Sequence, residues 1–193
     1  MYLRINIKSE DGRRKSEVET REYFGLRTSD FRQKVLRDNI YKYLPVMFIK
    51  LFLLSIFGIA MAHLEGVVVV YLRKALGMLD SESNAESIEK FPKRYLKIEM
   101  TREAATIIML AVIAFIAGNT WLERGIFFLW TFAFWDLFYY LSLFILIKWP
   151  PKLTTIDVLF LIPKPWIAPV WFPIGVSGLT IFIILILALT GIF

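Results

Sequence analysis

Seven ionisable side chains lie within or at the edges of long apolar stretches of this sequence, where a charged group is costly and usually has a purpose. They are His63, Glu65, Glu99, Arg102, Glu103, Asp136 and Asp157. If the apolar stretches cross a membrane in alternating directions, Asp136 lies near the midplane, Glu65 about one helical turn further out, and Glu103 near the face opposite the N-terminus. We therefore expect Glu65, Glu103 and Asp136 to line one funnel that opens on that face.

The spacing of these groups predicts which of them share a helical face. Glu99 and Glu103 are four residues apart, so their side chains point the same way. His63 and Glu65 are two residues apart, about 200° around a helix, and cannot both point at one site unless Gly66 distorts the turn. We favour Glu65 over His63 as the functional group.

Aromatic side chains surround the deepest carboxylate. Asp136 is followed at helical spacing by Tyr139 and Tyr140, which places two phenols beside it. Trp135 lies at the same depth, where its ring can line a pocket for a lipid, a quinone or an isoprenoid chain, and His63 is a further candidate for that pocket. Packing against lipid is the alternative explanation for these rings.

Two kinds of chemistry fit the carboxylates. Glu65, Glu103 and Asp136 can act as acid–base catalysts or as a proton relay if they are buried. Together with Glu99 they can instead hold a hard metal ion, Mg²⁺ or Mn²⁺, because helical bundles bind metals through inward-pointing carboxylates. The Glu-x-x-His pair that usually accompanies such carboxylates does not occur in this sequence.

A third hypothesis gives the same groups a structural role. In this hypothesis the acidic side chains near the ends of the spans form ion pairs, and Asp136 bonds tyrosine or backbone groups. The expected pairs join Arg73 and Arg102 to Glu65, Glu99 and Glu103. Ion pairs at the ends of membrane spans are common, so this hypothesis competes with both chemical ones.

The residue content excludes several classes of membrane enzyme. There is no cysteine, so disulfides, thiolate zinc sites, iron–sulfur clusters and thiol nucleophiles are excluded. A single histidine cannot supply the ligands of a bis-histidine haem, a histidine-box desaturase or a histidine-rich membrane hydrolase. Neither a Gly-rich phosphate loop nor a G-x-S-x-G motif appears, which leaves nucleotide and serine-hydrolase chemistry without support. The cofactor stays unknown.

The distribution of apolar residues assigns the chain to the membrane. Of 193 residues, 57% are hydrophobic, and they cluster in runs that are apolar on every side, whereas a soluble domain would show amphipathic periodicity. Residues 1–44 differ from these runs, because they hold eleven Lys or Arg and seven Asp or Glu. The net charge of +6 indicates contact with anionic lipid headgroups rather than nucleic acid, because basic residues flank the apolar runs.

The apolar runs predict four membrane spans in a transmembrane domain of residues 45–193. Their approximate bounds are 45–72, 104–120, 126–147 and 170–192. Residues 1–44 form a polar basic tail, in which 30–43 alternate apolar and basic side chains at helical spacing. This pattern predicts an amphipathic helix on the membrane surface, and packing against a partner is the alternative.

The segment before the last span contains an apolar stretch that four prolines follow. Residues 154–162 suit a short helix, and prolines at 163, 165, 169 and 173 then prevent its continuation. We expect a half-helix that is re-entrant or lies on the surface, because irregular backbone at membrane depth must line a cavity or the protein interior. An ordinary loop is the alternative.

Together these elements predict an all-α integral membrane protein: a bundle of about four transmembrane helices, an N-terminal amphipathic interfacial helix, and a Pro-broken half-helix before the last span. We expect a bacterial or archaeal cell membrane and a cytoplasmic N-terminus, because a charged tail is awkward to translocate. Three functions stay open: a non-catalytic subunit or scaffold of a membrane complex, a membrane-embedded enzyme for a lipid-phase substrate, and a proton- or ion-coupled transporter. The expected partners are the lipid bilayer and other membrane subunits.

Overall fold

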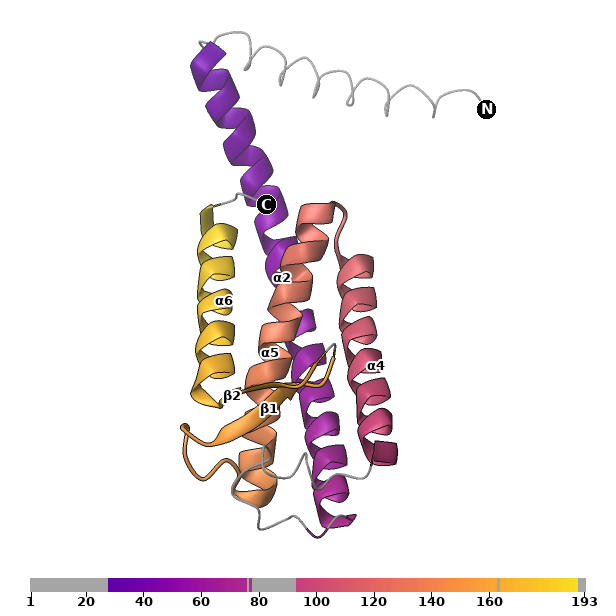
Figure 1. Cartoon of the computed structure of the whole chain (residues 1–193). Helices are drawn as coiled ribbons and strands as arrows, with labels where there is room; N and C mark the ends of the chain where they lie inside the picture. The colour runs from indigo at the N-terminus through magenta and orange to yellow at the C-terminus, as the bar shows by residue number, and fades with distance from the viewer. Residues whose placement is uncertain (1–27, 76, 78–92, 163, 191–193) are drawn as a thin grey trace, which may run out of the picture. The chain divides into compact units, whose positions relative to one another are not determined.

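The computed structural model of the chain describes residues 28–75, 77, 93–162 and 164–190. The chain divides into two compact units, Met1–Val46 and Met47–Phe193. Its described elements, in order, are α2 (Thr28–Ala75), α4 (Lys93–Ala117), α5 (Trp121–Ile147), β1 (Ile156–Phe160), β2 (Trp166–Pro169) and α6 (Trp171–Thr190). In the second unit α5 packs against both α4 and α6 and lies between them (Figure 1).

Four helices in the described ranges are long and apolar enough to cross a membrane. The stretches that meet both conditions are Leu44–Ala75, Arg94–Ala117, Trp121–Ile147 and Trp171–Thr190. Large apolar side chains such as Phe52, Ile116 and Leu189 are exposed on these helices, as expected where lipid replaces water as the solvent. The predicted all-α membrane bundle is therefore confirmed.

The second span begins earlier than its apolar run. We predicted a start near residue 104, but α4 begins at Lys93. The intervening residues are mostly Lys, Arg, Leu, Glu and Met, which have high helix propensity even though they are not apolar as a group. The apolar run thus marks the part suited to the membrane and not the whole helix, and Glu99, Arg102 and Glu103 all stand on α4.

The N-terminal end of α2 also differs from the prediction. Residues 30–43 and the span expected to begin at Pro45 belong to one helix, with Pro45 inside it. A proline removes one backbone hydrogen bond, a loss that membrane helices tolerate because neighbouring groups satisfy the freed carbonyl. The side chains of residues 28–43 lie outside the described part, so the surface position of this segment stays a prediction.

The half-helix predicted over residues 154–162 is wrong, because this segment forms a β-hairpin. Strand β1 pairs antiparallel with β2, with Ile156 opposite Pro169 and Phe160 opposite Trp166. A short apolar run does not distinguish a helix from a strand by periodicity, and here the β-branched Ile156 and Val158 favour the strand. Pro169 fits the second strand because a two-stranded sheet has edges that need no amide hydrogen.

Hydrogen bonds fix the helix ends at the α4–α5 link. The Thr120 hydroxyl caps α5 by accepting from the Glu123 amide at 3.1 Å. On the neighbouring helix, Lys50 of α2 donates to the carbonyl oxygen of Ala117, the last residue of α4, at 2.8 Å. A cation at a helix C-terminus satisfies an orphan carbonyl and interacts favourably with the helix dipole. This link lies at one end of α5, whereas the hairpin crosses α5 further along its length (Figure 1).

A glycine permits the close approach of α2 to α5. A Cβ atom at Gly58 would lie 2.9 Å from the carbonyl oxygen of Thr131, 3.1 Å from Phe134 Cβ and 3.3 Å from the Trp135 amide nitrogen. Two of these three neighbours are backbone atoms of α5, so the helices themselves would have to separate. This spacing sets the distance at which side chains of α2 and α5 can meet.

We expect Gly58→Ala to lower the free energy of unfolding by about 1–3 kcal/mol, the usual cost of overpacking. Gly178→Ala in α6 is the matched control, because an added Cβ there meets nothing within 4 Å. This control should be neutral or stabilise by up to about 1 kcal/mol, since alanine favours the helix. Reversible unfolding in mixed detergent micelles measures both, and equal effects of the two substitutions would show that the α2–α5 spacing is not set by Gly58.

Candidate functional site

Glu65 is the centre of a buried polar cluster between three helices. Its side chain on α2 is 8% exposed and forms an ion pair with Arg102 of α4. The second carboxylate oxygen, Oε2, accepts from Thr106 Oγ1 of α4 at 3.1 Å and from Trp135 Nε1 of α5 at 3.0 Å. Three donors from two neighbouring helices therefore converge on one carboxylate, and charge-assisted hydrogen bonds of this kind are the stronger ones.

Arg102 joins a second carboxylate to the same cluster. Its Nε donates to Glu99 Oε2 at 2.8 Å, and the two residues are one helical turn apart on α4. The guanidinium thus lies between two acidic side chains, one on its own helix and one on α2. We call the set Glu65, Glu99, Arg102, Thr106 and Trp135 the polar clamp. The structural hypothesis predicted that Arg73 and Arg102 pair with Glu65, Glu99 and Glu103. The structure contains two of these pairs, Arg102 with Glu65 and Arg102 with Glu99.

Glu103 turns to the hairpin and not to the polar clamp. Its Oε2 accepts from the Leu161 amide at 2.9 Å and its Oε1 from the Ile162 amide at 3.2 Å. Both amides follow β1, where the chain leaves the strand. The shared face expected for Glu99 and Glu103 does not bring them to a common partner, because one bonds Arg102 and the other bonds backbone. Glu103 ties the end of the hairpin to α4.

The hydrogen-bond partner of Asp136 lies on α6, a helix that supplies no described partner to Glu65 or Glu99. Ser177 Oγ of α6 donates to Asp136 Oδ2 at 2.8 Å, and both side chains are buried. The phenol of Tyr140, predicted to lie beside Asp136, donates instead to Asp157 Oδ2 of β1 at 3.1 Å. One helical turn separates Asp136 from Tyr140, so the helix presents them to different neighbours. Sequence periodicity placed the two groups on one face but could not show that the hairpin would supply a second carboxylate.

The Asp157 region forms a second buried polar contact. Asp157 is one of the seven ionisable groups named from the sequence, but its contact with Arg73 was not predicted. Asp157 is 2% exposed, and it interacts electrostatically with Arg73 at the end of α2. The Arg73 guanidinium also stacks on the Trp149 ring, 4.3 Å from the ring centroid. Cation–π contacts of this kind are stronger when the cation is desolvated. Arg73 was predicted to pair with a glutamate, but its described partners are the indole and Asp157.

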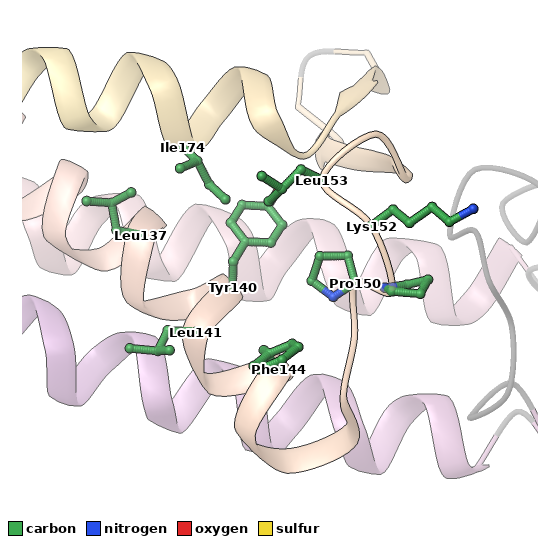
Figure 2. A pocket seen from close by; sticks show the side chains of 9 residues that line it. Leu137, Tyr140, Leu141, Phe144, Pro150, Lys152, Leu153 and Ile174 are labelled. Carbon is green, nitrogen blue, oxygen red and sulfur yellow. The ribbon is translucent and has the colours of Figure 1, made fainter.

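The predicted aromatic pocket is not assembled as expected. The indole of Trp135 is bound to Glu65. Tyr139 stacks on Trp135, with ring centroids 6.2 Å apart, and makes an edge-to-face contact with Tyr140 at 5.3 Å. His63 is exposed on α2, and its Nδ1 lies 3.4 Å from Ser142 Oγ. Of the four residues predicted for the pocket, only Tyr140 lines the apolar cavity in Figure 2.

The three carboxylates of the expected funnel are therefore held by three different sets of protein groups. Glu65 bonds the polar clamp, Glu103 the hairpin backbone and Asp136 a serine of α6. Among the described residues, no group of three or more acidic or histidine side chains is arranged to hold a metal ion. Glu65, Glu99, Glu103 and Asp136 are not brought together as one ligand set.

No known protein family, curated protein or solved structure matches this chain. Its function must therefore be inferred from the site geometry. Each acidic side chain of the expected funnel already accepts a hydrogen bond from the protein. This arrangement is typical of carboxylates that stabilise a fold rather than of catalytic carboxylates. A general base needs a lone pair within hydrogen-bond reach of the substrate proton, about 2.6–3.2 Å. Glu65 and Glu103 use both of their carboxylate oxygens for internal contacts.

Proposed function

We propose that this chain is a non-catalytic subunit or scaffold of a membrane complex, and that its carboxylates within the membrane hold the bundle and hairpin in one arrangement. The observation that carries the proposal is that both carboxylate oxygens of Glu65 accept from protein donors, namely Arg102, Thr106 and Trp135. A buried carboxylate with three donors is a stabilising group, and removing the Arg102 guanidinium would leave its charge without a cation. None of Glu65, Glu103 and Asp136 lines the apolar pocket, where a lipid-phase substrate would bind.

The exposed apolar surface supports a role in assembly. In the four helices, only 17–39% of the most apolar 18-residue window is buried inside the chain. The remaining surface is available to lipid or to the helices of other subunits, which associate in membranes mainly through close packing. A small protein with a fixed core and an open apolar surface is suited to bridge larger subunits. The amphipathic N-terminal segment would add contact with the membrane surface.

Membrane lipid analysis and native gels test this function together. In cells that lack the gene, we expect a larger membrane assembly to be lost while the lipid composition stays unchanged. Glu65→Gln should reduce the assembly in proportion to the loss of folded protein. The control is Glu123→Gln at the α4–α5 link, where the amide side chain keeps an oxygen that can accept from Asn119. A lipid species that depends on Glu65 while the protein stays folded would contradict a non-catalytic role.

A lipid-phase enzyme is the second candidate, and one observation favours it. Tyr140 lines the apolar pocket, and its hydroxyl is hydrogen-bonded to the buried Asp157. A phenol next to a carboxylate can transfer a proton to a bound molecule. Tyr140→Phe would then change the lipid composition of the membrane without loss of folded protein. The transporter hypothesis loses its main support, because a hairpin stands in place of the broken helix on which it depended.

For orientation we propose that the basic tail faces the cytoplasm of a bacterial or archaeal cell. Four spans place both ends of the described bundle on one side of the membrane. Charged tails are rarely translocated without a dedicated signal, which supports a cytoplasmic location. Reporter fusions after residue 193 and within the segment between α2 and α4 would report opposite sides.

A further inference from the structure

A pocket of about 370 Å³ lies between the end of α5, the start of α6 and the segment that connects α5 to the hairpin (Figure 2). Its walls are apolar and include Leu137, Leu141 and Phe144 from α5, Ile174 from α6, and Leu153. This volume falls within the range of small-molecule sites, about 300–1,000 Å³. Several of these side chains are exposed on the outer surface of the bundle, so the pocket is accessible from the surrounding lipid.

The rim of the pocket carries positive charge. Lys152 lines the pocket directly, and Lys148 Nζ lies 5.3 Å from the ring centroid of Phe144, which forms part of its wall. Both lysines are exposed. No acidic residue occurs between Asp136 and Asp157, and these two are buried and hydrogen-bonded inside the protein. The accessible charge contributed by this segment is therefore purely cationic.

The pocket lies at the ends of two membrane spans, where a bilayer would change from acyl chains to headgroups. Its apolar wall belongs to the last turns of the α5 span and the first turn of the α6 span, which end at Ile147 and begin at Trp171. Lys148 and Lys152 come just after Ile147, on the polar side of that boundary. Lysine side chains at such positions reach toward the headgroup region, where anionic lipids attract them.

We propose that this pocket binds an acidic phospholipid of the surrounding bilayer, with one acyl chain against the apolar wall and the anionic headgroup at Lys148 and Lys152. Apolar walls that open to lipid suit an acyl chain, and a cationic rim without accessible acidic groups selects a negative headgroup. The pocket shares no lining side chain with the polar clamp. This lipid site is therefore independent of the polar clamp, on which the proposed scaffold function rests.

Native mass spectrometry of the purified full chain tests the lipid site. The probes are phosphatidylglycerol and phosphatidylcholine with identical acyl chains. We expect the wild-type protein to bind phosphatidylglycerol at least tenfold more tightly. Lys148→Gln/Lys152→Gln should weaken phosphatidylglycerol binding by about thirty-fold, about fivefold for each lysine, and leave phosphatidylcholine binding unchanged. Lys74→Gln/Lys97→Gln, two exposed lysines on other helices, is the matched control and should bind like the wild type.

A pocket-filling variant separates the acyl-chain contact from the charge. Leu141→Trp places a large ring in the pocket and should weaken the binding of both lipids while the lysines stay in place. Equal affinity of the wild-type protein for the two lipids would overturn the proposal, as would equal losses in the two double-lysine variants. Thermal unfolding of each variant verifies that it is folded. If Leu141→Trp is not folded, the surface lysine variants alone decide the outcome.

Discussion

Arg102→Met is expected to lower the free energy of unfolding by about 3 kcal/mol, the low end of the range for breaking a buried ion pair, because the Arg102 side chain is 25% exposed. The substitution would leave two carboxylates without their cation: Glu65, which is 8% exposed, and Glu99, which is 12% exposed. Methionine fills a similar length of side chain, so the loss is electrostatic more than steric. Arg102 alone bridges the acidic groups of α2 and α4 in the polar clamp, which makes this the largest single effect we expect.

Arg94→Met is the matched control for this experiment. Arg94 stands on the same helix and is exposed, and the same change there should alter the free energy by no more than about 0.5 kcal/mol. Both variants are measured by reversible unfolding in mixed detergent micelles. If the two substitutions had equal effects, Arg102 would contribute no more than a surface charge and the polar clamp would not hold the helices.

Glu103→Leu is expected to release the end of the hairpin from α4. The change removes the acceptor of the Leu161 and Ile162 amides, and hydrogen bonds to a charged group are worth about 1.5–3 kcal/mol each. Loss of both bonds should therefore make local opening of the hairpin at least about a hundredfold more frequent, and hydrogen exchange at these two amides should accelerate by the same factor. Amide exchange followed by mass spectrometry in nanodiscs measures this acceleration.

Glu103→Gln provides the graded comparison. Glutamine keeps one carbonyl oxygen that can accept from an amide, so it should retain part of the protection at Leu161 and Ile162. Exchange elsewhere in α4 should stay close to that of the wild type in both variants. If Glu103→Leu left the exchange of the two amides unchanged, the hairpin would be held by its apolar contacts alone, and Glu103 would need another explanation.

The sequence predicted the helices well because a membrane-crossing helix has a strong and local signal. Apolar runs located all four spans, and the ends at Ala75 and Ile147 fall within a few residues of the predicted bounds. The start of α4 was predicted too late, because the polar residues that precede the apolar run also have high helix propensity. The apolar content of a segment thus indicates whether lipid or water surrounds it. Helix capping and helix propensity determine at which residue the helix begins.

The residues of the hairpin do not predict its structure, in contrast to the residues of the membrane spans. Ile156–Phe160 is five residues long and largely apolar, and it became a strand because Trp166–Pro169 lies opposite it. A strand exists only with its partner, and the pairing of two short segments depends on the loop and on the surface beneath them. Phe160 stacks on Phe132 of α5 with ring centroids 6.0 Å apart, which is a tertiary contact that no sequence pattern announces.

The types of the candidate residues and their apolar surroundings indicated that they are unusual. Most of their hydrogen-bond partners could not be predicted from the sequence. The rule that buried charges need a reason singled out Glu65, Glu103 and Asp136, and all three side chains are buried in the structure. Helical spacing also supported the local pair of Glu99 and Arg102. The backbone amides that bind Glu103 and the serine that binds Asp136 come from elements distant in sequence. Spacing rules operate within one helix, so they cannot show that three acidic groups with similar depth have three separate sets of partners.

The coupling between Glu65 and Arg102 tests most directly whether the polar clamp is structural. A double-mutant cycle with Glu65→Gln, Arg102→Met and the combined variant isolates the interaction of this pair. We predict that both single variants are destabilised and that their coupling is about 1–3 kcal/mol, the range for residues in direct contact. A coupling near zero would contradict a structural role of the polar clamp. A gain in stability from either single substitution would contradict it too, because such gains are common when functional groups are removed from an active site.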